Sequence, residues 1–466
     1  MTLEKSSKKI LILGGGFGGM YCAKKLECLM AKRKNIDAEI ILVSRQNFFV
    51  FTPMLPQVVS GMIESNHVVV PLRQVLKNTK FYEAEVASID VKKRRVNLWV
   101  ENNNNNYNDN GHVENESPLS NLTLDYDHLV ISLGSDTNFP KSANFAYMVF
   151  TLKNLKDALL LRNHIIDMLE RADIESDLDK RRQMLNFVIV GGGLSGVETA
   201  AELNAFFHKV VKYYPNLKAR FSELPPHVNI IQSRDRILPE LNAKLATDTL
   251  QKMNQDGISI ILNTKVIDVG KGFVRTVTKE GEQSTIPANT VIWTVGISPN
   301  PLTASIACKK MASGRPVVDS FLHVRGCENV WAVGDSACIM DEISSEPFPA
   351  TAQHALREAE VAAENIVNSL EKNNGLRKFK YSRDAQMALI GSKSAIANIA
   401  GINLSGFLIW CIWRAVYLKK LPMFKKRLRV ALDWIIDIFF DPDLTHLRGL
   451  KEDRKFENRP KHIESR

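Results

Sequence analysis

The sequence predicts an α/β protein with two dinucleotide-binding units, the second inserted into the first. Two glycine motifs predict this fold, GGGFGG at residues 14–19 and GGGLSG at residues 191–196. Both fit the pattern G-x-G-x-x-G, and each lies between a strand-like apolar run and a helix-like run. A third observation is the run VWAVGD at residues 330–335, which we interpret as a late strand that closes the first unit.

Glycine is the residue type that such a turn requires at three positions. The first glycine permits a tight turn, the second lets the backbone approach a pyrophosphate, and the third lets the helix pack on the strand. The phosphates then lie at the helix N-terminus, where free N–H groups and the helix dipole favour negative charge. In order, these positions are Gly14, Gly16 and Gly19 in the first unit and Gly191, Gly193 and Gly196 in the second. Two complete motifs predict two Rossmann-like domains and two nucleotide cofactors, a flavin and a nicotinamide.

The composition is that of a globular protein with a basic surplus. The chain has 466 residues, a net charge of +10 and 45% hydrophobic residues, enough for two domains with a core each. Its six cysteines show neither C-x-x-C nor metal-ligand spacing, so we expect reduced, packed thiols and no metal site. Residues 1–9 are polar, and we expect neither a signal peptide nor a transit peptide.

The rest of the chain divides around the two units. We expect a helix over residues 20–34 and strands over 39–43, 83–90, 94–100, 125–134 and 228–232, with a long helix over 152–171. The asparagine-rich residues 101–121 predict a mobile surface loop without chemistry. The predicted domains are 1–150 (flavin, first part), 151–299 (nicotinamide), 300–380 (flavin, second part) and 381–466 (a C-terminal membrane-associating region).

Several motifs in order resemble the two-dinucleotide flavoproteins, and the tail narrows the resemblance. They are GGGFGG, LVSRQNFFVFTPML, ISLGS, GGGLSGVETAAEL, DRILPEL, WTVGISPN, WAVGD and ATAQHA, followed by SGFLIWCIWRAVYL and RLRVALDWIIDIFF. The chain resembles the type II NADH dehydrogenases, single-chain NADH:quinone oxidoreductases of membrane surfaces. The resemblance covers nearly the whole chain, except the asparagine-rich stretch and the last few residues.

The resemblance implies a residue set for each nucleotide. For FAD it implies Gly14, Gly16, Phe17, Gly18, Gly19, Gly134, Gly334, Asp335, Ala352 and Gln353. For NADH or NADPH it implies Gly191, Gly193, Leu194, Ser195, Gly196, Glu198 and Gly296.

We expect three catalytic residues, of which the resemblance implies two, Glu198 and Gln353, and Arg357 is added from its position. Glu198 would assist proton transfer or orient the quinone, although a stabilising charge near a helix N-terminus is the alternative. Gln353 would bond the flavin and line the quinone site. Arg357 would stabilise negative charge on the reduced flavin or semiquinone. The protein supplies alignment and a dry pocket, while the flavin supplies the chemistry.

Three positions depart from the family pattern. The second strand of the flavin unit ends in Ser44 and Arg45 instead of the acid that holds the adenosine ribose, so we expect a different contact set for FAD. The equivalent acid of the nicotinamide unit is Gln232, followed by Arg234. Glutamine does not repel a 2′-phosphate and arginine can pair with it, so we expect NADPH to be accepted, unless Arg234 only completes a turn. Arg357 stands where the family pattern A-Q-x-A-x-Q has its second glutamine. This glutamine lies beside the quinone in the family, so the quinone contacts, and with them the electron acceptor, are open to change in this chain.

The tail is apolar, aromatic and basic. Residues 394–413 carry no charge but are interrupted by glycine and asparagine, so we expect a strand and turn over 393–400 and a helix from Leu404. Seven basic and no acidic residues follow over 414–429, and then a second apolar stretch over 430–440. This pattern favours amphipathic helices on an anionic lipid surface, with core helices or a homodimer interface as the alternatives. No recognition motif supports nucleic-acid binding.

Together these observations predict an FAD-dependent enzyme that passes a hydride from NADH or NADPH to flavin and two electrons to a membrane quinone. We expect a peripheral protein on the cytoplasmic side of the cell membrane, without proton pumping. The alternatives are a sulfide:quinone oxidoreductase using Cys338, a soluble ferredoxin or rubredoxin reductase, and a non-catalytic nucleotide sensor. A disulfide reductase is disfavoured because Cys22 and Cys28 lie on the first helix.

Overall fold

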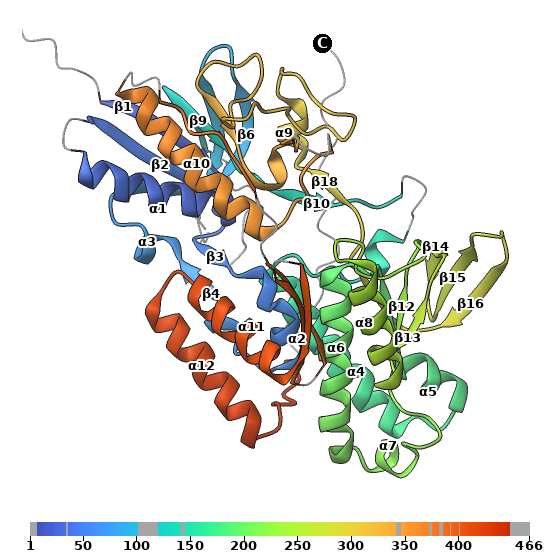
Figure 1. Ribbon diagram of the computed structural model, residues 1–466. Coiled ribbons are helices and arrows are strands. Elements are labelled where there is room, and N and C mark those ends of the chain that lie inside the picture. The colour runs from blue at the N-terminus through green and yellow to red at the C-terminus, as the bar shows by residue number, and fades with distance from the viewer. Residues whose placement is uncertain are drawn as a thin grey trace, which may run out of the picture. The chain divides into compact units, whose positions relative to one another are not determined.

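The computed structural model describes residues 7–33, 36–100, 120–140, 145–341, 346–371, 375–381, 385–391, 393–399 and 401–447 (Figure 1). The chain forms two compact units. Unit 1 contains residues 1–50, 69–137 and 297–382, and unit 2 contains residues 51–68, 138–296 and 383–466. Residues 101–119 of the predicted asparagine-rich loop lie outside the described residues, and the last two residues of that stretch begin a strand.

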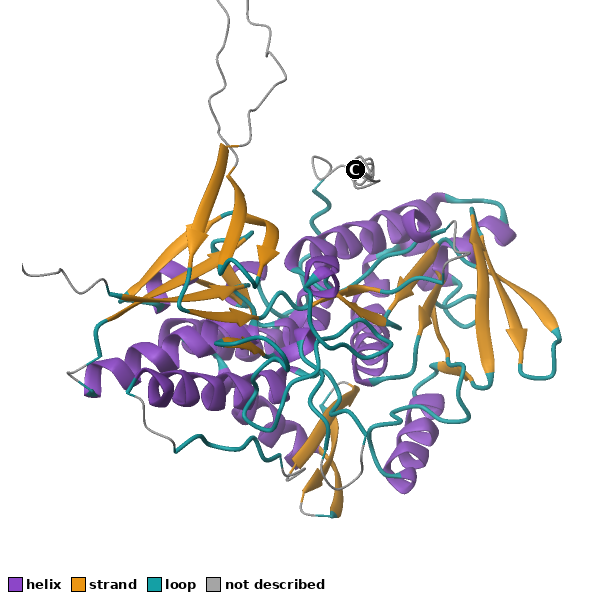
Figure 2. Ribbon diagram, turned by 90° about the horizontal axis from the view of Figure 1, so that it is seen from above, coloured by secondary structure: helices purple, strands orange, loops and turns teal. Residues whose placement is uncertain are grey.

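Unit 1 is built on a five-stranded parallel sheet in the order β19-β9-β1-β2-β5. Its strands are β1 (Lys8–Leu13), β2 (Ala38–Ser44), β5 (Thr79–Glu83), β9 (His128–Ile131) and β19 (Val330–Ala332). Strand β19 pairs with β9 across nearly two hundred residues of chain, which confirms the late return. Helices α1 (Phe17–Lys32) and α10 (Ala352–Leu370) lie side by side (Figure 1, Figure 2).

The remaining elements of unit 1 are short. The predicted pair of strands is confirmed as β6 (Glu85–Asp90) and β7 (Arg95–Val100), and β8 (Ser120–Asp125) adds a third strand that the sequence did not indicate. Two further pairs join β3 (Phe48–Val50) to β4 (Val69–Pro71) and β10 (Ser135–Thr137) to β18 (Ile297–Pro299). The short helices are α3 (Leu72–Val75) and α9 (Pro301–Ser305).

Unit 2 repeats the β-α-β plan on a four-stranded parallel sheet, β13-β12-β11-β17. Its strands are β11 (Asn186–Val190), β12 (His227–Ile231), β13 (Ser259–Ile261) and β17 (Thr290–Trp293). The helices are α2 (Leu55–Ser60), α4 (Leu155–Ile174), α5 (Leu178–Leu185), α6 (Leu194–Val210), α7 (Pro215–Ala219) and α8 (Ala243–Gln255). A second sheet of β14 (Thr264–Gly270), β15 (Phe273–Thr278) and β16 (Gln283–Pro287) projects at the right of both views (Figure 1, Figure 2).

The C-terminal region corrects one sequence prediction. Strands β20 (Ala385–Gly391), β21 (Ser394–Ile399) and β22 (Ile402–Gly406) form an antiparallel sheet, followed by α11 (Phe407–Lys420) and α12 (Phe424–Phe439). The helix expected from Leu404 begins at Phe407, because Leu404 pairs with Ala397 in the sheet. Gly401 has a φ of +86°, which permits the tight reversal that brings β22 back along β21.

The basic run of the tail is divided between α11 and α12, and two of its seven members, Arg414 and Lys426, are buried. Helix α12 begins at Phe424, within the basic run, and includes most of the second apolar stretch. Within the described ranges, no helix combines the length and the apolar character needed to cross a bilayer.

Candidate functional site

The first glycine turn leaves the N-terminus of α1 open. Gly14 has a φ of +103°, and a Cβ atom there would lie 2.2 Å from the carbonyl oxygen of Ser132. A Cβ atom on Gly19 would lie 1.9 Å from the carbonyl oxygen of Gly14, so α1 packs on the strand only because this residue has no side chain. Gly16 is exposed and precedes α1 without a side-chain cap, and no atom of the part of the chain that the structure describes lies within 4 Å of its Cβ position. A phosphate therefore fits against the first turn of α1.

The second turn has the same construction. Gly191 has a φ of +113°, and a Cβ atom on Gly196 would lie 2.0 Å from the carbonyl oxygen of Gly191. Gly193 precedes α6 without a side-chain cap, and among the described residues only the Glu240 Oε1, at 3.7 Å, comes near its Cβ position. The residues present thus fit two pyrophosphate groups, one in each unit.

Several predicted flavin contacts lie at the carboxyl edge of the unit 1 sheet. Ser44 ends β2, and its Oγ lies 2.8 Å from the Cβ position of Gly15, while Arg45 is exposed. Ser135 donates a hydrogen bond to the Asp335 carboxylate over 2.5 Å. Gly134 and Gly334 have φ values of +74° and +65°, which only glycine adopts freely. The Phe17 ring packs edge-on against Phe49 at 4.8 Å, and Gly18 approaches the Val333 side chain.

The N-terminus of α10 carries Ala352, Gln353 and Arg357. Thr351 caps the helix by accepting a hydrogen bond from the His354 backbone N–H. The Arg357 guanidinium lies 4.7 Å from the centre of the Tyr381 ring, a cation–π contact that holds this side chain along α10. Ala352 and Gln353 are partly exposed in the first turn.

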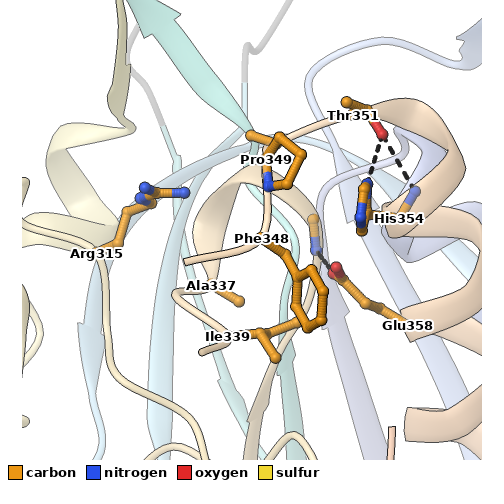
Figure 3. Close-up of a pocket in the computed structure, with 10 residues that line it drawn as sticks. Arg315, Ala337, Ile339, Phe348, Pro349, Thr351, His354 and Glu358 are labelled. Carbon is orange, nitrogen blue, oxygen red and sulfur yellow. Dashed lines mark hydrogen bonds between the residues drawn. The ribbon is translucent and has the colours of Figure 1, made fainter. Parts of the chain in front are cut away.

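A buried carboxyl group beside Asp335 was missed by the sequence analysis. Glu358 accepts a hydrogen bond from the Gly334 N–H over 2.5 Å, and burial raises the pKa of Glu358 to about 8. Figure 3 shows Thr351, His354 and Glu358 on one side of a small cavity and Arg315 on the other. An acidic residue six positions after Ala352, on the buried face of α10, was the available signal.

Glu198 lies in the second turn of α6 and is buried. Its Oε1 accepts a hydrogen bond from the Leu389 N–H of β20 over 3.2 Å. Burial raises the pKa of Glu198 to about 8, and the neighbouring Glu202 contributes to the increase. The alternative interpretation, a stabilising charge near a helix N-terminus, would require this buried carboxyl group to be ionised.

The end of β12 places Gln232 beside the second glycine turn. Its Oε1 accepts a long hydrogen bond from the Gly192 N–H over 3.4 Å, and its Nε2 donates to the carbonyl oxygen of Arg236. Arg234 is exposed next to it, and Ser195 is exposed at the start of α6 after Leu194. Gly296, with a φ of +75°, approaches the Asn138 backbone and is also exposed.

All six cysteines are free thiols. Cys22 is buried, and burial raises the pKa of its thiol to about 12. Cys338 is also buried, and burial raises its pKa. Neither environment favours the reactive thiolate that a disulfide or sulfide reaction would need.

A second buried polar group in unit 2 was also missed. Glu202 lies one turn after Glu198 on α6, and its Oε2 accepts a hydrogen bond from the Ser60 hydroxyl over 3.3 Å. Burial raises the pKa of Glu202 to about 7. The spacing of four residues between two acids in an otherwise apolar helix was a signal, but their partners on α2, α11 and α12 are distant in sequence.

Comparison with known proteins gives matches along nearly the whole chain. The family described as pyridine nucleotide-disulphide oxidoreductase matches residues 8–359, and the NDH2 C-terminal domain matches residues 385–443. A "Probable NADH dehydrogenase" of Dictyostelium discoideum is 30% identical over 94% of this chain and 91% of that protein. The "Type II NADH:quinone oxidoreductase Ndh" of Mycobacterium tuberculosis is 28% identical over 92% of this chain and 87% of its own length.

Solved structures share the fold. The structure of NDH2 from Plasmodium falciparum in complex with NADH matches with a TM-score of 0.81 and 21% identity, covering 94% of this chain and 100% of that one. The sulfide:quinone oxidoreductase from Aquifex aeolicus matches with a TM-score of 0.68 and 19% identity, covering 93% and 96% of the two chains.

The two glycine positions of the first turn should respond differently to one added methyl group. Gly16→Ala places the methyl in open space, so we expect the free energy of unfolding to stay within about 1 kcal/mol of wild type while flavin affinity falls at least about tenfold, or 1.4 kcal/mol. Gly19→Ala forces α1 off the strand and should cost about 3 kcal/mol or more. Urea unfolding of the flavin-free protein and flavin titration measure the two quantities. Equal loss of stability in both variants would contradict this account.

Proposed function

The chain belongs to the pyridine nucleotide-disulphide oxidoreductase family, in its type II NADH:quinone oxidoreductase branch, and on that premise we propose that it oxidises NADH or NADPH and reduces a membrane quinone with FAD as its cofactor. The observation that carries the proposal is the presence of two uncapped glycine turns of the same geometry in one chain. Each turn can hold one dinucleotide, and electron transfer from a nicotinamide to a flavin requires that both are bound. The sulfide:quinone oxidoreductase similarity is more distant, and the cysteine environments do not favour it.

In this proposal unit 1 holds FAD and unit 2 holds the nicotinamide nucleotide. The flavin contacts would come from the first glycine turn, Ser44, Asp335 and the start of α10. The nicotinamide contacts would come from the second glycine turn, Gln232 and Gly296. Bound FAD supplies the redox chemistry, accepting a hydride and releasing two electrons. The domain limits predicted from the sequence remain a proposal, and they differ from the two units in that residues 51–68 and 138–150 belong to unit 2.

Three side chains are proposed to act on the reaction. Glu198 is buried and holds a proton near neutral pH, which suits transfer to a quinone oxygen. Gln353 would contact flavin and quinone from the first turn of α10. Arg357, which lies against Tyr381, would place a positive charge near developing negative charge.

The first test is an anaerobic titration of the purified flavoprotein with NADH and with NADPH, followed by a soluble quinone. We expect bleaching of the flavin absorbance by the nucleotide and recovery on addition of the quinone. Bleaching without recovery would keep the flavoprotein assignment and exclude quinone as the acceptor. Absence of bleaching by both nucleotides would contradict the proposed function.

NADPH is expected as a substrate because Gln232 removes the carboxylate that repels a 2′-phosphate and Arg234 is exposed beside it. Arg234→Ala should lower kcat/KM for NADPH at least about tenfold, the value of one charged hydrogen bond, with little change for NADH. Arg220→Ala removes another exposed arginine of unit 2 and is the control. Wild-type efficiency with NADPH more than about a hundredfold below NADH would contradict the prediction.

We also propose that α11 and α12 seat the protein on an anionic membrane surface, at the cytoplasmic face. Large apolar side chains are exposed along the two helices and the preceding strand, and Lys419 and Lys425 are exposed among them. This combination suits a helix pair lying in the lipid interface. The exposed apolar residues are Ile402, Leu404, Phe407, Leu408, Ile412, Phe424, Leu428, Leu432, Ile435, Ile436, Ile438, Phe439 and Phe440.

Vesicle binding tests the membrane surface. Phe424→Ser and Phe439→Ser each remove a ring that is at least 75% exposed in the protein. Each should weaken binding to anionic vesicles about tenfold, because burying such a ring is worth about 1.5–3 kcal/mol. Ile174→Ser, at the end of α4 and 82% exposed, is the control. If the wild-type protein does not bind vesicles, and Phe439→Ser converts a dimer to a monomer, the exposed surface is a homodimer interface instead.

A further inference from the structure

Two partly exposed cysteines lie in neighbouring loops of unit 1. Cys308 follows helix α9 by three residues, and Cys327 precedes strand β19 by three residues. The Cys327 thiol donates a long hydrogen bond to the carbonyl oxygen of Ala307 over 3.9 Å, so its sulfur lies against the peptide that leads into Cys308. Both cysteines are free thiols, and both loops lie outside regular helices and strands.

Covalent geometry limits how far apart the two cysteines can be. In a trans peptide the carbonyl oxygen lies about 3 Å from the Cα atom of the next residue. The Cys327 sulfur is therefore within about 7 Å of the Cys308 Cα atom. The two Cα atoms of a disulfide usually lie about 4.4–6.8 Å apart. A bridge between these cysteines thus requires rotation of the side chains and a small shift of the two loops.

The two thiols are also close enough for the charge of one to affect the other. Burial raises the pKa of the Cys308 thiol, a negative charge on Cys327 adds to the increase, and Lys310 opposes it. Burial also raises the pKa of the Cys327 thiol. Arg94 and Glu328, the latter next to Cys327, form an exposed ion pair with each other. Because the thiolate is the reactive form, both thiols are mostly protonated and react slowly at neutral pH.

A buried phenol lies beside Cys327. Tyr126 is 4% exposed, and its hydroxyl has no hydrogen-bond partner among the described residues. Burial raises the pKa of Tyr126 to about 12, and the charge of Cys327 contributes to the increase, so the two groups are near each other. A buried donor without an acceptor costs free energy. An oxygen atom added to the Cys327 sulfur would give this donor an acceptor.

We propose that Cys308 and Cys327 form a reversible disulfide when the protein meets a peroxide, and that Tyr126 stabilises the first product of this oxidation. The Cys327 thiolate attacks hydrogen peroxide, so that an S–O bond forms, the O–O bond breaks and hydroxide leaves. The Cys308 sulfur then attacks the Cys327 sulfur, so that the S–S bond forms and the oxygen leaves as water. In total the two thiols lose two electrons and two protons, and the peroxide becomes two water molecules. A dithiol reductant reverses the bridge by exchange.

The bridge closes the chain segment 309–326 into a loop. This segment is already folded back on itself, because the Val317 N–H donates to the carbonyl oxygen of Lys309. A cross-link of this loop length restricts mainly the unfolded chain and so stabilises the folded state. Cys327 precedes the amino end of β19, whereas the predicted flavin contact Asp335 follows its carboxyl end. Oxidation therefore strengthens unit 1 without occupying the edge of the sheet that is predicted to hold the flavin.

Peroxide treatment of the purified flavoprotein, followed by alkylation of the remaining thiols, tests the bridge. We expect the number of free thiols to fall by two from six, and mass spectrometry to find a peptide pair that links Cys308 to Cys327. Dithiothreitol should restore both thiols. Because both pKa values are raised above the ordinary thiol value of 9.0, the rate of oxidation should still increase with pH at that value.

Three substitutions separate the roles of the side chains. Cys308→Ser should leave Cys327 as a sulfenic acid that dimedone traps, and Cys327→Ser should give neither the bridge nor the trapped product. Tyr126→Phe should slow oxidation about tenfold without lowering the unfolding temperature, because the hydroxyl it removes has no hydrogen-bond partner among the described residues. Cys28→Ser removes an exposed thiol of α1 and is the matched control, which should form the bridge at the wild-type rate.

The bridge should raise the unfolding temperature of the oxidised protein by about 3–6 °C. A linked peptide with a lower unfolding temperature would show that bridging distorts the loops, and would overturn the proposal. Peroxide that leaves both thiols open to alkylation, or that links them only to Cys28, would also overturn it. Oxidation of Tyr126→Phe at the wild-type rate would overturn the role of the phenol. None of these measurements involves electron transfer from a nicotinamide, so the result is independent of the proposed function.

Discussion

In both units the third glycine of the turn lies against the carbonyl oxygen of the first, at a distance that no methyl group could occupy. This contact sets the start of α1 and of α6 directly over the ends of β1 and β11, and it leaves the first turn of each helix uncapped. Backbone N–H groups then remain for an anionic ligand, and the helix dipole favours it. Several other predicted ligand contacts lie at or just after the carboxyl ends of neighbouring strands, which parallel pairing brings to the same edge.

Short sequence patterns predicted those elements whose structure depends mainly on residues close by in the chain. The glycine turns, β1, β11, the pair β6–β7 and the return of β19 follow from short patterns, and all are present. The start of α11 was predicted three residues early, because Leu404 continues an apolar run and only pairing with Ala397 identifies it as strand. Glu358 and Glu202 were missed for a related reason. Their significance depends on partners that the fold supplies, the Gly334 N–H and the side chains of α2, α11 and α12.

Three buried glutamates therefore stand out against the apolar packing, two on α6 and one on α10. The pKa values of Glu198 and Glu358 are raised to about 8 and that of Glu202 to about 7, in each case mainly by burial. The folded protein binds more protons than the unfolded chain between the ordinary glutamate pKa of 4.5 and these values. The free energy of unfolding contributed by these groups consequently falls as the pH rises through that range. Packing alone would favour apolar residues at such positions, and each carboxyl group is instead held by a hydrogen bond, from the Leu389 N–H, the Ser60 hydroxyl or the Gly334 N–H.

Helix α12 combines buried polar contacts with the exposed apolar surface of the tail. Trp434 and Asp437 face the buried cluster, whereas Phe424, Ile435 and Phe439 are more than half exposed. A helix whose only role was to bind the lipid surface would not require a buried hydrogen bond to Gln57 or an ion pair with Lys209. A helix that served only to complete the core would not expose so many apolar side chains. Both features are explained if α12 lies at the membrane surface and is also fixed to α2 and α6 by these two polar contacts.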